Sequence, residues 1–324
     1  MEKFLFFNHY NLDAYFNLAL EEYLLKQKTG SYIYLWQNDN SVIIGVNQNA
    51  FNEINFEYTN KNNVKVVRRL TGGGAVYHDI FNVNYTIIEP FNKDEDSYVK
   101  FTKPVIDYLN SIGVKAEFSG RNDVCIDGKK ISGNAQTIYK DRILHHGTLL
   151  FSSNIEALNN SLKENKLKIS DKGIKSIRAR VTNISEYLPE GFTISSFIEG
   201  LSNFLRKDCQ EFSLSKEDIC NIEKLKKEKY STYEWNIGSS PKGSTKFEYK
   251  FNFGVLSLVF DLVKGKMQNV NVFGDFFSIK PIGEWAEKLN GLEFTKAKLK
   301  DVFVDVKNYI VNANGIEILE KIFE

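Results

Sequence analysis

Residues 68–79, RRLTGGGAVYHD, form the part of this chain that is best suited to bind an anion. The glycine triplet at 72–74 lets the backbone turn tightly and present bare N–H groups, as anion-binding loops do. Arg68 and Arg69 precede it, and a guanidinium group binds carboxylate or phosphate through two parallel hydrogen bonds. Neither GxxxxGK followed by Ser or Thr nor GxGxxG is present, so the pattern excludes a P-loop and a dinucleotide-binding turn. The plain alternative is a glycine hairpin with solvated arginines, which the Tyr-His-Asp cluster at 77–79 makes less favoured.

Residues 120–135, GRNDVCIDGKKISGNA, could place a carboxylate beside a lysine. Asp127 and Gly128 form the dipeptide favoured in two-residue hairpin turns, so the flanking segments should pair as strands. Asp123 and Lys130 then approach each other, and such a pair fits an ATP site in which Asp holds magnesium and Lys neutralises phosphoryl oxygens. Taken alone the pair carries little weight, because exposed cross-strand ion pairs are common.

The neighbouring histidines His145 and His146 raise the question of a metal site. Adjacent residues of a strand point to opposite faces of the sheet, and no further Cys or His cluster would complete a coordination sphere. We therefore expect one buried, hydrogen-bonded histidine and one exposed histidine. Cys125 lies between Val124 and Ile126, so a buried small apolar side chain is favoured over a nucleophile.

A basic segment follows at 172–183, KGIKSIRARVTN, with four cations within nine residues. Its plain interpretation is a solvated loop. Its functional interpretation is a mobile flap that closes over an anionic ligand.

The elements that must position these groups alternate without a regular βαβ order, which predicts an α+β fold. Helices are expected at 12–26 (capped by Asp13), 101–112, 195–211 and 215–230, and strands at 32–36, 41–46, 64–68, 75–78, 83–88, 124–126, 130–132 and 144–151. Residues 232–243 are the best linker candidate. Beyond them a meander is expected at 246–253, 255–263 and 267–273, followed by helices at 282–289, 296–306 (capped by Thr295) and 316–323. We therefore divide the chain into residues 1–240 and a small α+β domain at 241–324.

The overall composition describes an ordinary globular chain with no excess of charge. The 324 residues include 42 Lys and Arg against 41 Asp and Glu, a net charge of +1, with 42% hydrophobic and 26% charged residues. Near-neutrality disfavours nucleic acid and anionic membrane as partners. No apolar run reaches the roughly 18 residues of a membrane span, and the N-terminal segment lacks the pattern of a signal peptide. Three cysteines are too few for a disulfide framework. These features predict a cytoplasmic protein.

Taken together, the motifs resemble the lipoate–protein ligase A family. The resemblance rests on DAYFNLALEE at 13–22, LWQN at 35–38, VIIG at 42–45, NQN at 47–49, RR and the glycine triplet at 68–74, GRND at 120–123, 129–135, 145–150, 178–183, YEWN at 233–236, SP at 240–241 and GDFF at 274–277. Their order and spacing cover nearly the whole chain, so the set is specific although each motif alone is weak.

The resemblance implies a large mixed-sheet catalytic domain of the biotin/lipoate ligase type, with a small α+β accessory domain that swings away before the acceptor docks. It also implies a two-step reaction. Free lipoate or octanoate and MgATP give the acyl-adenylate and pyrophosphate, and the acyl group then passes to a lysine of an acceptor protein. The implied acceptors are lipoyl domains of 2-oxoacid dehydrogenase complexes and the glycine-cleavage H protein. No prosthetic group is implied, and a monomer is expected.

The resemblance also assigns residues to roles. Lys130 is the central cation in both steps, and Asp123 is the magnesium ligand. Contacts to ATP or the adenylate are expected from Arg69, Gly72, Gly73, Gly74, Val76, Tyr77, His78, Asn82, Asn122, Asp123, Arg178 and Thr182. Contacts to lipoate are expected from Arg69, Thr71, Lys130, Ala135 and His146. The chain departs from many relatives at Phe81, where they carry Gly, and at Val46, where several carry a basic residue.

Two alternatives stay open at this point. An octanoyl or lipoyl transferase of the same fold works through an acyl-cysteine without ATP, but no Cys lies between positions 126 and 208, and residues 115–120 read KAEFSG. A non-catalytic lipoate-binding relative would not need to keep Lys130, Asp123 and the glycine triplet together. Biotin ligase shares the architecture, but its glycine–arginine loop has a different pattern.

Overall fold

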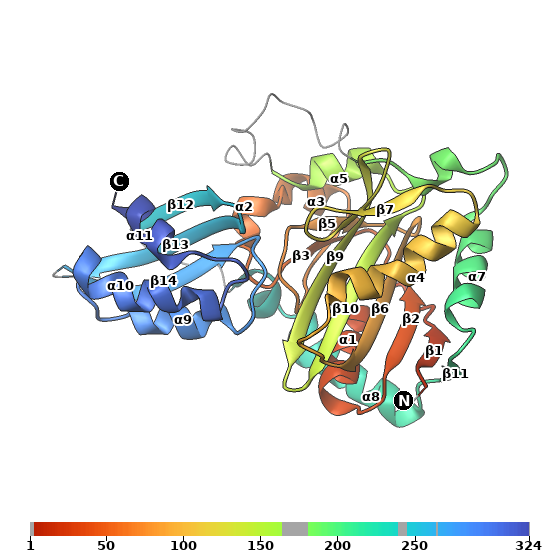
Figure 1. Cartoon of the computed structure of the whole chain (residues 1–324), viewed down its shortest axis with the longest axis horizontal. Coiled ribbons are helices and arrows are strands. Elements are labelled where there is room, and N and C mark those ends of the chain that lie inside the picture. The colour runs from red at the N-terminus through yellow and green to blue at the C-terminus, as the bar shows by residue number, and fades with distance from the viewer. Residues whose placement is uncertain (1–2, 164–180, 239–244, 264, 324) are drawn as a thin grey trace.

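An eight-stranded mixed sheet is the framework of the larger part of the molecule (Figure 1). The computed structural model describes residues 3–163, 181–238, 245–263 and 265–323. The strand order is β11-β1-β2-β6-β10-β9-β8-β7. The strands are β1 (Leu5–Asn8), β2 (Tyr32–Trp36), β6 (Asn82–Pro90), β7 (Ala116–Ser119), β8 (Asp123–Ile126), β9 (Lys129–Tyr139), β10 (Arg142–Leu150) and β11 (Gln210–Glu211). Only β1 pairs in parallel, with β2 and β11, and the other neighbours are antiparallel.

A second sheet of three strands, in the order β4-β3-β5, carries the arginine pair and the glycine triplet. Its strands are β3 (Ser41–Ile44), β4 (Lys65–Arg68) and β5 (Val76–His78). Ile43 and Val67 of this sheet share one apolar core with helix α1 (Ala14–Gln27) and with Tyr34 and Trp36 of the large sheet. The small sheet therefore packs on the same face of the large sheet as α1.

Helices cover both faces of the large sheet because its central strands are buried on both sides. Helices α4 (Ser97–Ser111) and α7 (Ile194–Leu205) pack on one face and α1 lies on the other (Figure 1). Asp13 accepts a hydrogen bond from the Tyr15 N–H and caps α1, as expected. The remaining helices of this part are α2 (Ala50–Glu53), α3 (Phe56–Lys61), α5 (Ile155–Ser161) and α8 (Lys216–Leu225), with helical turns at Ile184–Tyr187, Lys226–Tyr230 and Glu234–Gly238.

The C-terminal part has its own sheet and core. Its meander consists of β12 (Thr245–Phe251), β13 (Gly254–Val263) and β14 (Lys266–Gly274), and its helices are α9 (Ile282–Leu289), α10 (Lys296–Val304) and α11 (Gly315–Ile322). Trp285, Phe260 and Phe303 are fully buried in this second core. The predicted meander and three helices are confirmed.

Two sequence predictions about elements are wrong. The helix expected at 195–211 ends at Leu205, and Gln210 and Glu211 form a parallel strand beside β1 instead. The linker expected at 232–243 contains the helical turn Glu234–Gly238, in which Trp235 and Asn236 bind Arg68. Long-range partners decide both outcomes, and neither partner is visible in the local pattern.

The predicted hairpin turn between β8 and β9 is confirmed. Asp127 and Gly128 both have positive φ, at 49° and 73°, which the favoured two-residue turn requires. Within the described residues, no helix is long and apolar enough to cross a bilayer.

Candidate functional site

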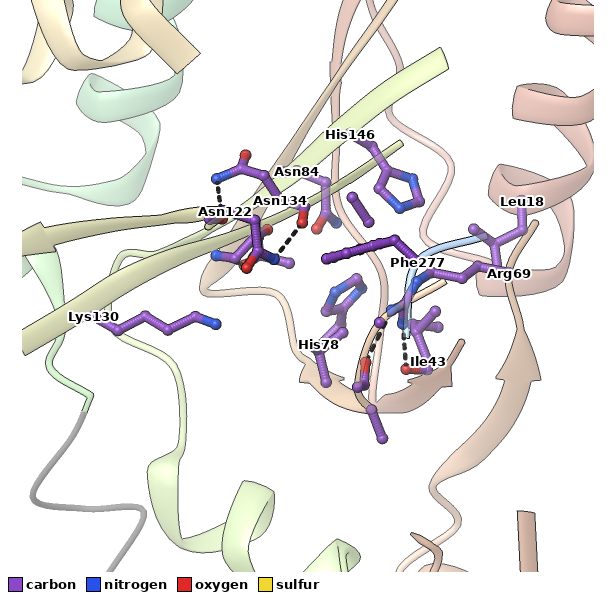
Figure 2. A pocket seen from close by; sticks show the side chains of 18 of the residues that line it. Leu18, Ile43, Arg69, His78, Asn84, Asn122, Lys130, Asn134, His146 and Phe277 are labelled. Carbon is purple, nitrogen blue, oxygen red and sulfur yellow. Dashed lines mark hydrogen bonds between the residues drawn. The ribbon is translucent and has the colours of Figure 1, made fainter. Parts of the chain in front are cut away.

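A pocket lies between the large sheet and the small sheet (Figure 2). Strands β2, β6, β9 and β10 form its floor, and β3, β5 and the loop at 69–75 form its roof. Leu18 of α1 contributes at one end, and Phe277 reaches in from the C-terminal part (Figure 2). The walls therefore come from segments that are far apart in the sequence.

The strand register lines up the side chains on the pocket floor in a row. Trp36 of β2 pairs with Asn84 of β6, and Asn84 pairs with Thr148 of β10. The Thr148 hydroxyl accepts a hydrogen bond from the Gly133 N–H of β9, and Gly133 pairs with Asp123 of β8. The row thus runs from Asp123 at one end to Trp36 at the other.

The two ends of this row differ in burial. Asp123 and Lys130 are each 35% exposed at the side chain, and Asn122 is half-buried, so this end is the mouth. Trp36 and Asn84 are buried, as are Leu18, Ile43 and His78 around them. The other end is therefore closed and mainly apolar.

Lys130 stands at the mouth in contact with Asp123. Its Nζ lies 2.7 Å from Asp123 Oδ1, a close ion pair rather than a directed hydrogen bond. A Cβ added at Gly133 would lie 3.0 Å from the Lys130 Nζ, so glycine at that position leaves room for the ammonium group.

The end of the basic segment binds to the same lysine. The Thr182 N–H donates to the Lys130 carbonyl at 3.0 Å, and Val181 bridges to Lys130 in parallel. Thr182 is therefore beside the mouth, whereas Arg178, also expected there, lies outside the described residues.

Arg69 is buried and braces the glycine loop. Its Nε donates to Thr71 Oγ1 at 2.8 Å, its Nη1 to the Ile43 carbonyl, and its Nη2 to the carbonyls of Gly72 and Gly74. Burial lowers the pKa of the guanidinium to about 10, which leaves it charged at neutral pH. A contact between Arg69 and a ligand anion stays a prediction.

Arg68 is buried and turns away from the pocket. It donates five hydrogen bonds to backbone carbonyls, those of Gly45, Val46, Gln48, Trp235 and Asn236. Its guanidinium therefore ties the small sheet to the turn Glu234–Gly238 and has a structural role.

The glycine loop is held in a conformation that larger residues could not adopt. Gly73 has φ of +90°, and its carbonyl approaches Gly45 so closely that a Cβ there would collide with it. The Gly73 N–H donates to the Phe276 carbonyl at 3.3 Å, so one amide of the triplet is bound by the C-terminal part.

His146 faces the pocket within a chain of buried polar groups. Its Nδ1 lies 2.9 Å and 3.0 Å from the two Glu21 carboxylate oxygens, and its Nε2 lies 2.9 Å from Thr71 Oγ1. Glu21 also accepts from the Thr86 hydroxyl, which in turn accepts from Trp36 Nε1. The position of His146 is therefore set from helix α1.

His145 points to the opposite face of the sheet, as the strand alternation predicts. It is fully buried and bonded to Gln136, and burial lowers its pKa well below the ordinary value. His146 is not exposed, because the small sheet covers it. No group of three or more metal-ligating side chains occurs in the part of the chain that the structure describes.

His78 enters the closed end of the pocket from β5. Its Nδ1 lies 3.0 Å from Asn38 Nδ2, while its Nε2 is buried without a partner among the described residues. Burial, followed by the nearby His146 and Arg69, lowers its pKa to about 3, so the ring is neutral. Tyr77 points the other way, into the core of α2 and β3, and donates to Asn40 Oδ1.

The C-terminal part closes over the pocket through the segment after β14. The Phe277 ring lies beside Gly73 and 4.5 Å from the Arg121 guanidinium, which donates to the Phe253 carbonyl at 2.7 Å. The Gly274 N–H donates to the Asn47 carbonyl at 2.6 Å. Arg121 therefore joins the two parts of the molecule, a role that its sequence neighbours did not indicate.

The structure brings most of the predicted site residues together. Those that line the pocket are Arg69, Gly73, Gly74, Val76, His78, Asn122, Lys130, Ala135 and His146. Five others each bind a lining residue, namely Thr71, Gly72, Asn82, Asp123 and Thr182. Tyr77 does not line the pocket with the others.

Sequence reasoning missed ten lining residues. They are Leu18, Trp36, Ile43, Ala75, Asn84, Gly133, Asn134, Gly147, Thr148 and Phe277. Most lie inside the motifs already quoted, and strand alternation from His146 would have indicated Thr148. Strand alternation could not indicate Phe277, because it follows β14 of the C-terminal part and belongs to no strand.

A mainly apolar slot with a lysine and a carboxylate at its mouth and a glycine loop in its wall suits a carboxylic acid that is to be activated, as in the class of acyl-adenylate-forming ligases. The family model of the lipoyl protein ligase A/B catalytic domain matches residues 13–206, and that of the bacterial lipoate protein ligase C-terminus matches residues 240–322. The chain therefore belongs to the lipoyl protein ligase A/B family, which confirms the resemblance and the fold class.

Similar proteins agree with this assignment over the whole length. The lipoate-protein ligase LplJ of Bacillus subtilis is 40% identical over 98% of this chain and 100% of its own length. LipL1 of P. falciparum, solved in complex with lipoate, is 27% identical with a TM-score of 0.82 over 98% of each chain. Lipoate-protein ligase A, solved with bound ATP, is 26% identical with a TM-score of 0.62 over 74% of this chain and 99% of its own.

Proposed function

We propose that this protein is an ATP-dependent lipoate–protein ligase that activates free lipoate, or octanoate, and transfers the acyl group to a lysine of an acceptor protein. The observation that carries the proposal is Lys130 at the mouth of a mainly apolar slot, paired with Asp123. Membership of the family and the similarity to ligases solved with lipoate and with ATP support it.

In the first step, a carboxylate attacks the α-phosphorus of ATP and displaces pyrophosphate, which brings two anions together. The Lys130 ammonium, freed from Asp123, is positioned to lie between the acyl carboxylate and the phosphoryl oxygens. The glycine loop and Arg69 also line the pocket, and we propose them as further donors to the ligand anion. In the second step, the same ammonium stabilises charge on the carbonyl oxygen as the acceptor lysine attacks and AMP departs.

Magnesium fits the donor set at the mouth. A magnesium ion keeps several waters and uses one or two carboxylates together with substrate phosphates. Asp123 offers one partly exposed carboxylate beside the expected phosphates. Bound with ATP, the ion would neutralise charge on the phosphoryl oxygens, while Lys130 would orient the attacking carboxylate.

The acceptors that we propose are lipoyl domains of 2-oxoacid dehydrogenase complexes and the glycine-cleavage H protein. We propose a cytoplasmic monomer, with a catalytic domain at residues 1–240 and an accessory domain at 241–324. The contacts of Phe276 and Phe277 with the glycine loop cover the pocket, so the accessory domain must swing away before an acceptor docks.

Lipoate-dependent exchange of pyrophosphate into ATP tests the first step, and transfer to a purified lipoyl domain tests the second. We expect exchange in the native protein and a loss of at least about a hundredfold in Lys130→Ala. Lys129→Ala is the matched control, because Lys129 is exposed on the same hairpin. Absence of exchange with both lipoate and octanoate under MgATP would overturn the proposal.

The transferase alternative depends on a reactive cysteine. Cys125 is buried, and its burial raises the pKa of the thiol, which disfavours the nucleophilic thiolate. We therefore expect Cys125→Ser to retain exchange and transfer. Complete inactivation of that variant would restore the transferase hypothesis.

A further inference from the structure

The closed end of the pocket combines an apolar wall with two buried donors that have no acceptor. Leu18, Trp36 and Ile43 supply the apolar wall. His78 is 3% exposed and Asn84 is 1% exposed, and among the described residues His78 Nε2 and Asn84 Nδ2 have no hydrogen-bond partner. Figure 2 shows both side chains directed into the pocket. Buried polar groups are costly to leave unpaired, so these two indicate a ligand that brings an acceptor.

A directed chain of hydrogen bonds fixes which nitrogen of His78 carries the proton. The Asn17 Nδ2 group donates to the backbone carbonyls of Asn11 and Gln37 and to Asn38 Oδ1. Since Asn38 Oδ1 is an acceptor there, its Nδ2 is the group that faces His78 Nδ1 at 3.0 Å. His78 Nδ1 must therefore accept, and in the neutral ring the proton lies on Nε2, the atom that enters the pocket.

Asn84 presents its amide to the same place. Its Oδ1 accepts from Asn82 Nδ2 at 2.9 Å, which leaves the Nδ2 group for the pocket. The Trp36 ring is packed edge-on against His78, with ring centroids 6.2 Å apart, and Trp36 also pairs with Asn84 across the strands. The two donors therefore surround one small volume next to an indole.

The position of this volume decides which part of the ligand reaches it. Gly133, over which the Lys130 ammonium lies, and Asn84 are two strands apart, which corresponds to roughly 10 Å across the sheet. With the carboxylate held at Lys130, a medium-chain acyl group extends to His78 and Asn84 with its far end. In lipoate that end is the dithiolane ring, whose sulfur atoms are weak acceptors, and in octanoate it is a methyl group.

We propose that His78 and Asn84 are specificity-determining residues that favour a dithiolane over a plain hydrocarbon end by donating hydrogen bonds to its sulfur atoms. The proposal rests on the ligase function and deepens it. A site built to donate a hydrogen bond discriminates against an analogue without the acceptor, because its donors are then left unpaired. Asn17 and Asn38 act as positioning residues, since they set the tautomer of His78.

The test compares three acids in ATP–pyrophosphate exchange by the full-length protein: lipoate, octanoate and 5-cyclopentylpentanoate, which keeps the ring and lacks sulfur. We expect kcat/KM for lipoate to exceed that for the cyclopentyl acid by about tenfold. His78→Leu and Asn84→Val should each reduce this ratio severalfold. His78→Gln, whose amide can still donate, should keep most of the ratio.

Two controls separate the inference from a general loss of function. Asn110→Ala changes an exposed asparagine of α4, which bonds Ala116 and lies outside this pocket, and should leave the ratio unchanged. The chain has four histidines, so subtraction of the His78→Gln spectrum assigns the ¹⁵N signals of His78. We expect a protonated Nε2 and an unprotonated Nδ1 at neutral pH.

Several outcomes would overturn the inference while leaving the ligase function intact. Equal activation of lipoate and the cyclopentyl acid would mean that the pocket recognises only the shape of the ring and not its sulfur atoms. An unchanged ratio in both His78→Leu and Asn84→Val, or a proton on Nδ1 of His78, would remove the proposed donors. No activation of any of the three acids would instead refute the ligase function itself.

Discussion

Replacement of Arg68 tests whether this arginine is structural, although it stands next to Arg69 in the motif that we propose to bind an anion. Its five donated hydrogen bonds all end on backbone carbonyls, and its burial lowers the pKa of the guanidinium to about 10. Hydrogen bonds from a charged group contribute about 2 kcal/mol each, so the five together represent roughly 10 kcal/mol. Leucine carries no charge, so the variant avoids the cost of burying the guanidinium, which the lowered pKa puts at roughly 3 kcal/mol. Because water also reaches some of the released carbonyls, we expect Arg68→Leu to lower the free energy of unfolding by about 4 to 5 kcal/mol.

The assay is urea unfolding followed by tryptophan fluorescence. Trp235 is a local probe, because its indole N–H donates to the Arg68 carbonyl at 2.9 Å. Arg68→Lys should lose about half as much, since an ammonium has three donors on one atom instead of a planar fork. Arg206→Leu is the control, because Arg206 is partly exposed and pairs with Glu211 only at 3.8 Å. A loss in Arg68→Leu below about 1 kcal/mol, or no larger than in the control, would refute the structural role.

Three further predictions concern the site, the acid stability and the joint between the two parts. Glu21→Gln removes the carboxylate that holds His146 and should raise the KM for lipoate about threefold to tenfold with little change in kcat. A larger effect on kcat than on KM would contradict a positioning role for Glu21. Burial lowers the pKa of His9 to about 4 and that of His78 to about 3, below the value near 6.5 in the unfolded chain. The unfolded state therefore binds more protons at acid pH, and the free energy of unfolding should fall from pH 7.5 to pH 5. An unchanged urea midpoint over this range would contradict the prediction. Arg121→Ala removes the bond to Phe253 and should speed hydrogen exchange of the Gly73 amide about tenfold without unfolding either core, and unaltered exchange would show that Arg121 does not hold the joint.

Local signals predicted those elements whose stability is itself local. The cap at Asp13, the turn at Asp127 and Gly128, and helix α9 follow from side-chain capping, positive φ and apolar periodicity within a few residues. By contrast, Gln210 and Glu211 became a strand because an open edge of β1 lay beside them. An open edge exists only in the assembled sheet, so the sequence of the residues that pair with it does not indicate a strand.

The same division applies to the pocket. The glycine triplet could be predicted as a tight turn because three glycines follow a strand, and Lys130 could be predicted because its motif resembles that of the family. Asn84 and Phe277 could not, since an asparagine in a strand and a phenylalanine after a strand acquire their role only through the strand register and the packing of the C-terminal part.

Helix α1, which the local pattern predicts, positions pocket residues that the local pattern does not predict to be in contact with it. Asn17 and Glu21 are four residues apart, so they lie on one face of the helix, and both are buried although they are polar. Asn17 acts through Asn38 on His78, and Glu21 binds His146 directly. One helix face therefore sets the orientation of both pocket histidines. Neither Asn17 nor Glu21 lines the pocket, so a change at either position should affect ligand binding only through the histidine that it orients.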